Sequence, residues 1–195
     1  EVTKEFGIGS GGVPLLTGTS IYQEELEKLI AKISGMDDTI LFSSGYTANL
    51  GVISGLIRPN NLIIHDKLDH ASLLDGTVMS GAKMIRYKHG DINDLERLLK
   101  DNSPQYPNGI LVVTDGVFSM DGDIAKLPQI LEITRKYDAI LLVDEAHATG
   151  VIGDKGAGTL SHYGITDRKN IILTGTLSKA IGTVGGVYNG FTRCY

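Results

Sequence analysis

The chain has 195 residues, 42% of them hydrophobic and 21% charged, which is typical of one globular domain rather than a disordered chain. The formal net charge of −5, without an arginine-rich run, argues against nucleic acid as the main partner. Cys194 is the single cysteine, so a disulfide framework and a cysteine zinc site are excluded, and no apolar run approaches the ~20 residues of a membrane span. Because residues 1–12 also lack a signal-peptide pattern, we expect a cytoplasmic protein without a membrane span.

The first predicted element is a helix. Ser20 and Gln23 form a capping-box pattern, and Gly35 is placed to end the helix. An apolar stripe at helical spacing lies between them, at Ile21, Leu26, Leu29, Ile30 and Ile33.

Short apolar runs follow at residues 39–42, 62–64, 83–87, 110–114, 140–144, 171–175 and 186–189. Most are apolar throughout rather than alternating, which is typical of strands buried on both faces. Helical patterns beginning at Asp91 and Pro128 lie between some of these runs. The sequence therefore predicts an α/β fold, with a mostly parallel seven-stranded sheet and helices on both faces.

Polar motifs follow three of the predicted strands, at residues 43–45, 144–147 and 176–179. In open parallel sheets, ligands bind beyond the carboxyl ends of the strands. We therefore expect these three segments to share one site.

Lys179 ends the segment 174–179, which runs from a strand into hydroxyl side chains. A lysine shielded from water loses its proton more readily, and its neutral amine can attack an aldehyde. Thr176 and Ser178 suit a phosphate group. A solvated surface lysine is the alternative.

Asp144 ends the very apolar strand 140–144, and a buried carboxylate needs a partner. In pyridoxal 5′-phosphate (PLP) chemistry that partner is the protonated pyridine nitrogen, whereas a helix N-cap is the alternative. His147, three residues later, is placed to reach the same cofactor or its 3′ oxygen.

Ser44, Gly45 and Tyr46 open the helix after the first strand, where backbone N–H groups favour an anion. The imidazole of His70 is suited to lie over a planar ring, although a lone histidine is more often simply hydrogen-bonded. Ser119 is equally ambiguous by itself.

Together these segments resemble the α-oxoamine synthase family of fold-type-I PLP enzymes, whose large domain has the aspartate aminotransferase-like fold. The resemblance covers nearly the whole chain and is carried by the order and spacing of residues 9–12 (GSGG), 17–20 (TGTS), 69–72 (DHAS), 115–122 (DGVFSMDG), 143–147 (VDEAH) and 174–179 (TGTLSK).

The resemblance implies a role for each matching position. It makes Lys179 the Schiff-base lysine and acid/base, Asp144 the partner of the pyridine nitrogen, and His70 the histidine stacked on the ring. Ser119 and His147 then lie near the 3′ oxygen. The phosphate cradle comprises Gly45, Tyr46 and Thr176, beside Ser44 and Ser178.

The resemblance also implies the reaction, a condensation of an amino acid with an acyl-CoA by a homodimer. The 8-amino-7-oxononanoate synthase and glycine C-acetyltransferase types are favoured, without deciding the substrate pair. Residues 1–195 are expected to be the PLP-binding large domain, inactive alone because the smaller C-terminal domain, which holds the substrate-carboxylate arginine, lies outside the chain.

Other readings stay open. A PLP aminotransferase on the same fold shares the lysine, the aspartate and the cradle, and a non-catalytic PLP-binding subunit is another alternative, although Lys179 argues against it. Residues 144–147 also spell a helicase box, but the phosphate loop that such an ATPase needs is absent from the sequence.

Overall fold

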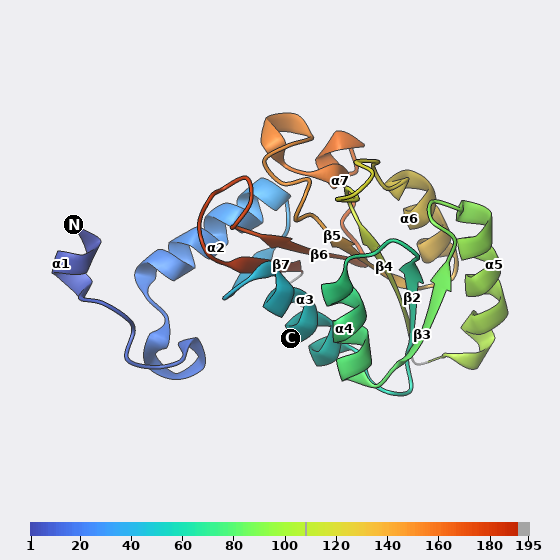
Figure 1. Cartoon of the computed structure of the whole chain (residues 1–195), viewed down its shortest axis with the longest axis horizontal. Helices are drawn as coiled ribbons and strands as arrows, with labels where there is room; N and C mark the ends of the chain where they lie inside the picture. Colours follow the sequence, from blue (N-terminus) through green and yellow to red (C-terminus); the bar gives the residue numbers. More distant parts are fainter. Residues whose placement is uncertain (108, 191–195) are drawn as a thin grey trace.

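The computed structural model of the chain describes residues 1–107 and 109–190, so Cys194 lies outside the described residues. Seven strands form one sheet in the order β1-β7-β6-β5-β4-β2-β3 (Figure 1). Only β7 runs antiparallel to its neighbours, β1 and β6, among the described strands, which confirms the predicted mostly parallel sheet. The strands are Asp38–Phe42 (β1), Leu62–Asp66 (β2), Lys83–Tyr87 (β3), Ile110–Asp115 (β4), Ile140–Asp144 (β5), Ile171–Thr176 (β6) and Gly186–Gly190 (β7).

The helices are Val2–Phe6 (α1), Ile21–Ser34 (α2), Gly45–Leu56 (α3), Ala71–Ser80 (α4), Ile92–Asn102 (α5), Leu127–Lys136 (α6) and Thr159–His162 (α7). Short turns of π-helix at Pro14–Gly18 and of 3₁₀-helix at Ser103–Gln105 and Asp154–Gly156 complete the elements.

Local sequence explains where the predicted helices begin and end. The Ser20 hydroxyl accepts the N–H of Gln23, whose side chain accepts the N–H of Ser20 in return, and Gly35 closes α2 with a φ of 66°. Asp91 caps α5, and Pro128 lies in the first turn of α6. The three predicted helices are confirmed.

Two apolar cores lie on opposite faces of the sheet, because side chains alternate along each strand. Helices α3 and α4 cover one face with Ile53 and Leu73, against Val113 and Leu142. Helices α5, α6 and α7 cover the other, where the core includes Leu95, Leu99, Ile130, Leu131, Leu160, Val112 and Val143. Burial on both faces explains the continuous apolar runs.

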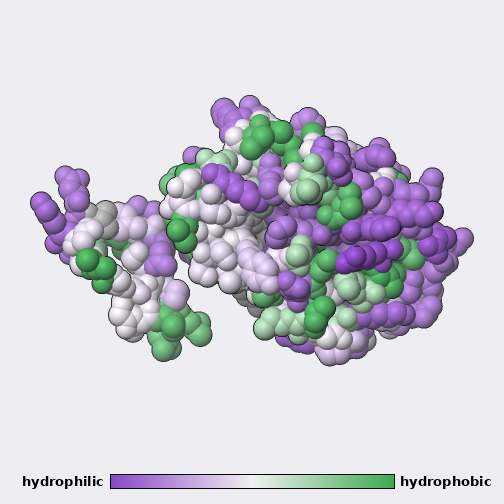
Figure 2. Space-filling model, in the orientation of Figure 1, coloured by the Kyte–Doolittle hydropathy of each residue, from purple (hydrophilic) through white to green (hydrophobic). Residues whose placement is uncertain are grey.

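The N-terminal arm, residues 1–19, extends away from the sheet and leads into α2 (Figure 1). Its apolar side chains are exposed, with Ile8 at 93% and Leu15 at 92%, and hydrophobic surface is visible along it (Figure 2). The predicted α2 stripe does form, but Leu29 and Ile33 remain more than half exposed. Periodicity identified this apolar face, and only part of it is covered by the described residues.

Among the described helices, none has both the length and the apolar character required to cross a membrane.

Candidate active site

A pocket opens at the carboxyl ends of β4, β5 and β6, between the start of α3 and the loop from β2 to α4. Its volume is about 270 Å³, close to the lower limit for small-molecule sites. Every predicted site residue except Ser119 lines it, namely Ser44, Gly45, Tyr46, His70, Asp144, His147, Thr176, Ser178 and Lys179. The sheet-edge rule therefore correctly predicted which segments meet.

Strand register explains why two carboxyl groups face the pocket. Asp115 on β4 pairs directly with Asp144 on β5, and alternation directs both toward the face covered by α3 and α4. Glu145, one residue further, points to the opposite face. There its Oε2 accepts the Thr159 N–H at 2.9 Å and the Thr159 hydroxyl at 2.8 Å. This carboxyl therefore holds the start of α7 instead of facing the pocket.

Asp144 is 5% exposed, and both of its oxygens are hydrogen-bonded. Oδ1 accepts the Ala146 N–H at 2.8 Å, and Oδ2 accepts Asn49 Nδ2 at 2.7 Å. Residues 145–148 form a turn rather than a helix, so Asp144 is not a helix N-cap. It is a buried carboxylate that faces a pocket.

Asn49, in the middle of α3, was missed from the sequence. Its Nδ2 also donates to Ser72 Oγ at 2.8 Å, whereas its buried Oδ1 has no partner among the described residues. The only signal was one amide side chain in a largely apolar helix, placed one turn beyond Gly45. Ser72, which links Asn49 to His70, was missed as well.

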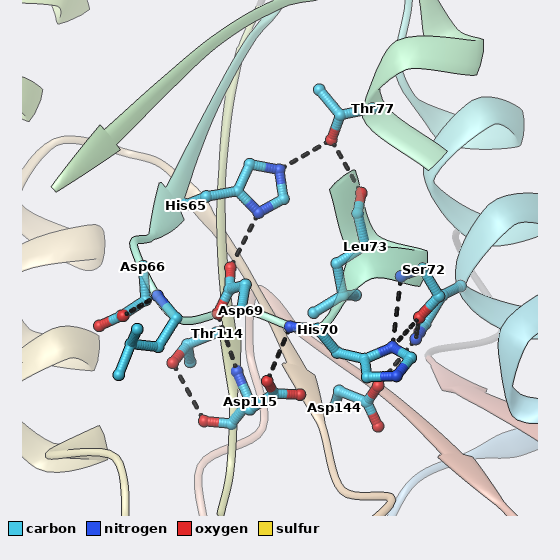
Figure 3. Close-up of polar contacts among 12 residues, drawn as sticks. His65, Asp66, Asp69, His70, Ser72, Leu73, Thr77, Thr114, Asp115 and Asp144 are labelled. Atoms are coloured by element: carbon cyan, nitrogen blue, oxygen red, sulfur yellow. Dashed lines mark hydrogen bonds and ion pairs between the residues drawn. The ribbon is translucent and has the colours of Figure 1, made fainter. Parts of the chain in front are cut away.

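His70 is the N-cap of α4. Its Nδ1 accepts the Ser72 N–H at 3.2 Å and lies 2.8 Å from Ser72 Oγ, so the ring proton of the neutral imidazole is on Nε2. Its backbone N–H donates to Asp115 Oδ2 at 2.9 Å (Figure 3). The ring and the backbone of His70 are thus held separately.

Asp115 lines the pocket and was also missed as a site residue. It is 4% exposed, and its pKa is raised to about 8, first by burial and then by the neighbouring Asp144. Its position at the end of a buried strand was the available signal, the same one that identified Asp144.

Lys179 and His147 contact each other at the pocket mouth, with Nζ 2.8 Å from Nε2. Burial, followed by the charge of Lys179, lowers the pKa of His147, so its neutral ring accepts a hydrogen bond from the lysine Nζ. Lys179 itself is exposed, because it lies in the loop after β6. The expected shielding of this lysine from water is not provided by the described residues.

The start of α3 and the end of β6 form a polar cradle on one side of the pocket. A side chain on Gly45 would place its Cβ 2.9 Å from the Thr176 Cβ, so only glycine allows this approach. The hydroxyls of Thr176 and Ser178 are 2.7 Å apart beside the first N–H groups of the helix. Hydroxyls next to a helix N-terminus suit a phosphate group.

Ser119 does not line the pocket. It is exposed at the tip of a turn bounded by the bridge between Val117 and Ile124, so its predicted role stays a prediction. The described residues also contain no group of three histidine, cysteine or acidic side chains arranged to hold a metal ion.

Comparison with known proteins agrees with this geometry. The family model described as aminotransferase class I and II matches residues 1–192. An 8-amino-7-oxononanoate synthase from Thermoanaerobacter pseudethanolicus is 46% identical over 190 residues, which cover 97% of this chain and 48% of that protein. The chain thus spans about half the length of the curated relatives it matches.

Two solved structures are similar over nearly the whole chain. A serine palmitoyltransferase from S. paucimobilis with bound PLP–myriocin aldimine has a TM-score of 0.90 and 36% identity, covering 97% of this chain and 47% of that one. The 8-amino-7-oxononanoate synthase from Francisella tularensis has a TM-score of 0.82 and 33% identity, covering 98% and 52%. The chain therefore belongs to the aminotransferase class I and II family, and the predicted resemblance to its α-oxoamine synthase group is confirmed.

Proposed function

We propose that the intact protein is a PLP-dependent acyltransferase that condenses an amino acid with an acyl-CoA, of the 8-amino-7-oxononanoate synthase type. The observation that carries the proposal is a single pocket that joins the buried Asp144, the cradle at Gly45 and the amine of Lys179. These are the three attachments that PLP needs, for its ring nitrogen, its phosphate and its aldehyde. The named relatives support the acyltransferase type over an aminotransferase.

The pocket fits the cofactor in two respects. The close approach of Gly45 to Thr176 leaves backbone N–H groups and hydroxyls facing the space where a phosphate would lie. Asp144 is buried, faces the pocket and accepts two hydrogen bonds, and a carboxylate is the group that a protonated ring nitrogen requires.

Each side chain contributes a distinct function. PLP, when bound, supplies an electron-withdrawing ring that stabilises a carbanion at the amino-acid α-carbon. Lys179 would hold the cofactor through Nζ and take the α-proton, and the neutral His147 accepts a hydrogen bond from that amine. Asp144 would keep the ring nitrogen protonated. His70, whose ring is fixed by Ser72, would cover one side of the cofactor and exclude water there.

We also propose that residues 1–195 form the cofactor-binding domain and that the protein is a homodimer. The apolar surface on the arm and on α2 supports a partner, because surfaces of this kind mark interaction sites. Light scattering on the intact protein would check this. Leu15→Glu should shift the dimer to monomer, whereas Val78→Glu, at an exposed position on α4, should not.

The decisive experiment loads the intact protein with PLP and reduces it with borohydride. Mass spectrometry of the peptides should find the cofactor fixed on Lys179, and a label on another lysine would remove this assignment. Release of CoA, with formation of a ketone from an amino acid and an acyl-CoA, distinguishes the acyltransferase from an aminotransferase. A new amino acid without CoA release would favour the aminotransferase.

A further inference from the structure

We propose that Asp69 and Asp115 are positioning residues, which form a reciprocal clamp that fixes His70 at the pocket. The N–H of Asp115 donates to Asp69 Oδ1 at 3.2 Å, and the N–H of His70 donates back to Asp115 Oδ2 at 2.9 Å (Figure 3). The two bonds run in opposite directions between the loop before α4 and the end of β4. They tie His70 to the strand that carries one wall of the pocket.

The clamp is anchored from behind by a buried histidine. His65 Nδ1 lies 2.8 Å from Asp69 Oδ2, and both side chains are completely buried. His65 Nε2 lies 2.8 Å from Thr77 Oγ1, whose hydroxyl donates to the carbonyl of Leu73 at 3.1 Å. Asp69 is therefore tied to both β2 and α4.

Proton counting defines the charge of this anchor. Because the Thr77 hydroxyl gives its proton to Leu73, the hydrogen on the other contact must come from His65 Nε2. His65 Nδ1 and Asp69 Oδ2 then share one proton, which leaves the pair neutral overall. Burial lowers the pKa of His65 to about 3 and raises that of Asp69 well above its usual value, so the proton lies on Asp69.

A neutral anchor leaves Asp69 Oδ1 free to accept the Asp115 N–H without adding another charge beside Asp115 and Asp144. The clamp then has one consequence for the pocket. The ring of His70 is set by Ser72, but the place of its backbone relative to β4 is set by Asp115. Because the clamp is in the folded chain itself, its existence does not depend on the proposed function, whereas its effect on PLP does.

The test compares two variants of Asp115 in the intact protein. Asp115→Ala removes the acceptor for the His70 N–H. Asp115→Asn retains a carbonyl oxygen, and an amide closely resembles the neutral acid that this group becomes below its pKa of about 8. Asp94→Ala is the matched control, since Asp94 also accepts a backbone N–H, from Lys88 at 2.9 Å, but lies far from the pocket.

The first readout is hydrogen exchange at the His70 amide without PLP, followed by mass spectrometry. Asp115→Ala should speed exchange by about 10-fold or more, which is the loss expected for one good hydrogen bond. Asp115→Asn should restore slow exchange, and Asp94→Ala should not change it. Unchanged exchange in Asp115→Ala, or equally fast exchange in both Asp115 variants, would overturn the clamp.

The second readout is the visible circular dichroism and the dissociation constant of bound PLP. Asp115→Ala should change the dichroism and weaken binding several-fold, and Asp115→Asn should recover most of both. An altered exchange rate with unaltered PLP signals would overturn the positioning role. Failure of the wild-type protein to bind PLP at all would instead count against the proposed function, while the exchange result still decides the clamp.

Discussion

Replacing Asp144 by asparagine should separate catalysis from folding. In the native pocket Asp144 Oδ2 accepts Asn49 Nδ2, and Oδ1 accepts the Ala146 N–H. An asparagine that keeps its oxygen toward Ala146 turns an NH₂ toward the NH₂ of Asn49, and two donors then face each other. The fold therefore survives only if Asn49 can adapt.

The structure provides this adaptation. Asn49 Oδ1 is buried without a partner among the described residues, so a half-turn of its amide brings an acceptor toward the new NH₂. The same rotation places Oδ1 against Ser72 Oγ, so the Ser72 hydroxyl then donates to Asn49 instead of to His70 Nδ1. His70 Nδ1 still accepts the Ser72 N–H. One hydrogen bond is lost in total, and the Asn49 NH₂ takes the buried place where Oδ1 had no partner, so the free energy of unfolding should fall by about 1–3 kcal/mol.

The rate should fall for a separate reason. Removing a preorganised charge opposite the developing reaction centre costs on the order of 100-fold or more, which corresponds to about 2.7 kcal/mol or above in the transition state. Urea unfolding of the intact Asp144→Asn protein would measure the loss of stability. CoA release with saturating PLP would measure the loss of rate. Near-normal turnover would show that Asp144 is only structural. A stability loss beyond about 3 kcal/mol would refute the proposed turn of Asn49.

Three further predictions concern Asp69, Glu145 and Gly45. Asp69→Asn should change stability by less than about 1 kcal/mol in urea unfolding, since its NH₂ can donate to His65 as the protonated acid does, whereas Asp69→Ala should cost several kcal/mol; equal losses would show that Asp69 is a charged partner. Burial raises the pKa of Glu145 to about 7, so its contribution to stability is present below the ordinary value of 4.5 and is lost, by about 3 kcal/mol, as the pH rises through 7. Glu145→Gln should flatten this part of the stability–pH curve, and an unchanged slope would assign it to other groups. Gly45→Ala should weaken PLP binding about 10-fold or more in a fluorescence titration, because its Cβ would displace Thr176 from the cradle; an unaltered dissociation constant would contradict the cradle.

Much of this fold could be predicted because its signals are local. The capping box at Ser20 and the uninterrupted apolar run before Asp144 each specify an element from neighbouring residues alone. The general rule for parallel sheets then correctly gathered Gly45, Asp144 and Lys179 into one pocket, although they are far apart in the chain.

The tertiary structure alone decided which polar groups pair. Asn49 and Asp144 are 95 residues apart, and Asp69 and Asp115 are 46 apart, so no periodicity or spacing in the sequence could join them. The register of β4 against β5 sets Asp115 beside Asp144, while alternation along β5 turns Glu145 to the opposite face. Local patterns determine which element forms, because backbone hydrogen bonds and apolar periodicity act between neighbouring residues. Partnership between side chains depends on how the finished elements pack, because it requires atoms from distant segments to meet within hydrogen-bonding distance.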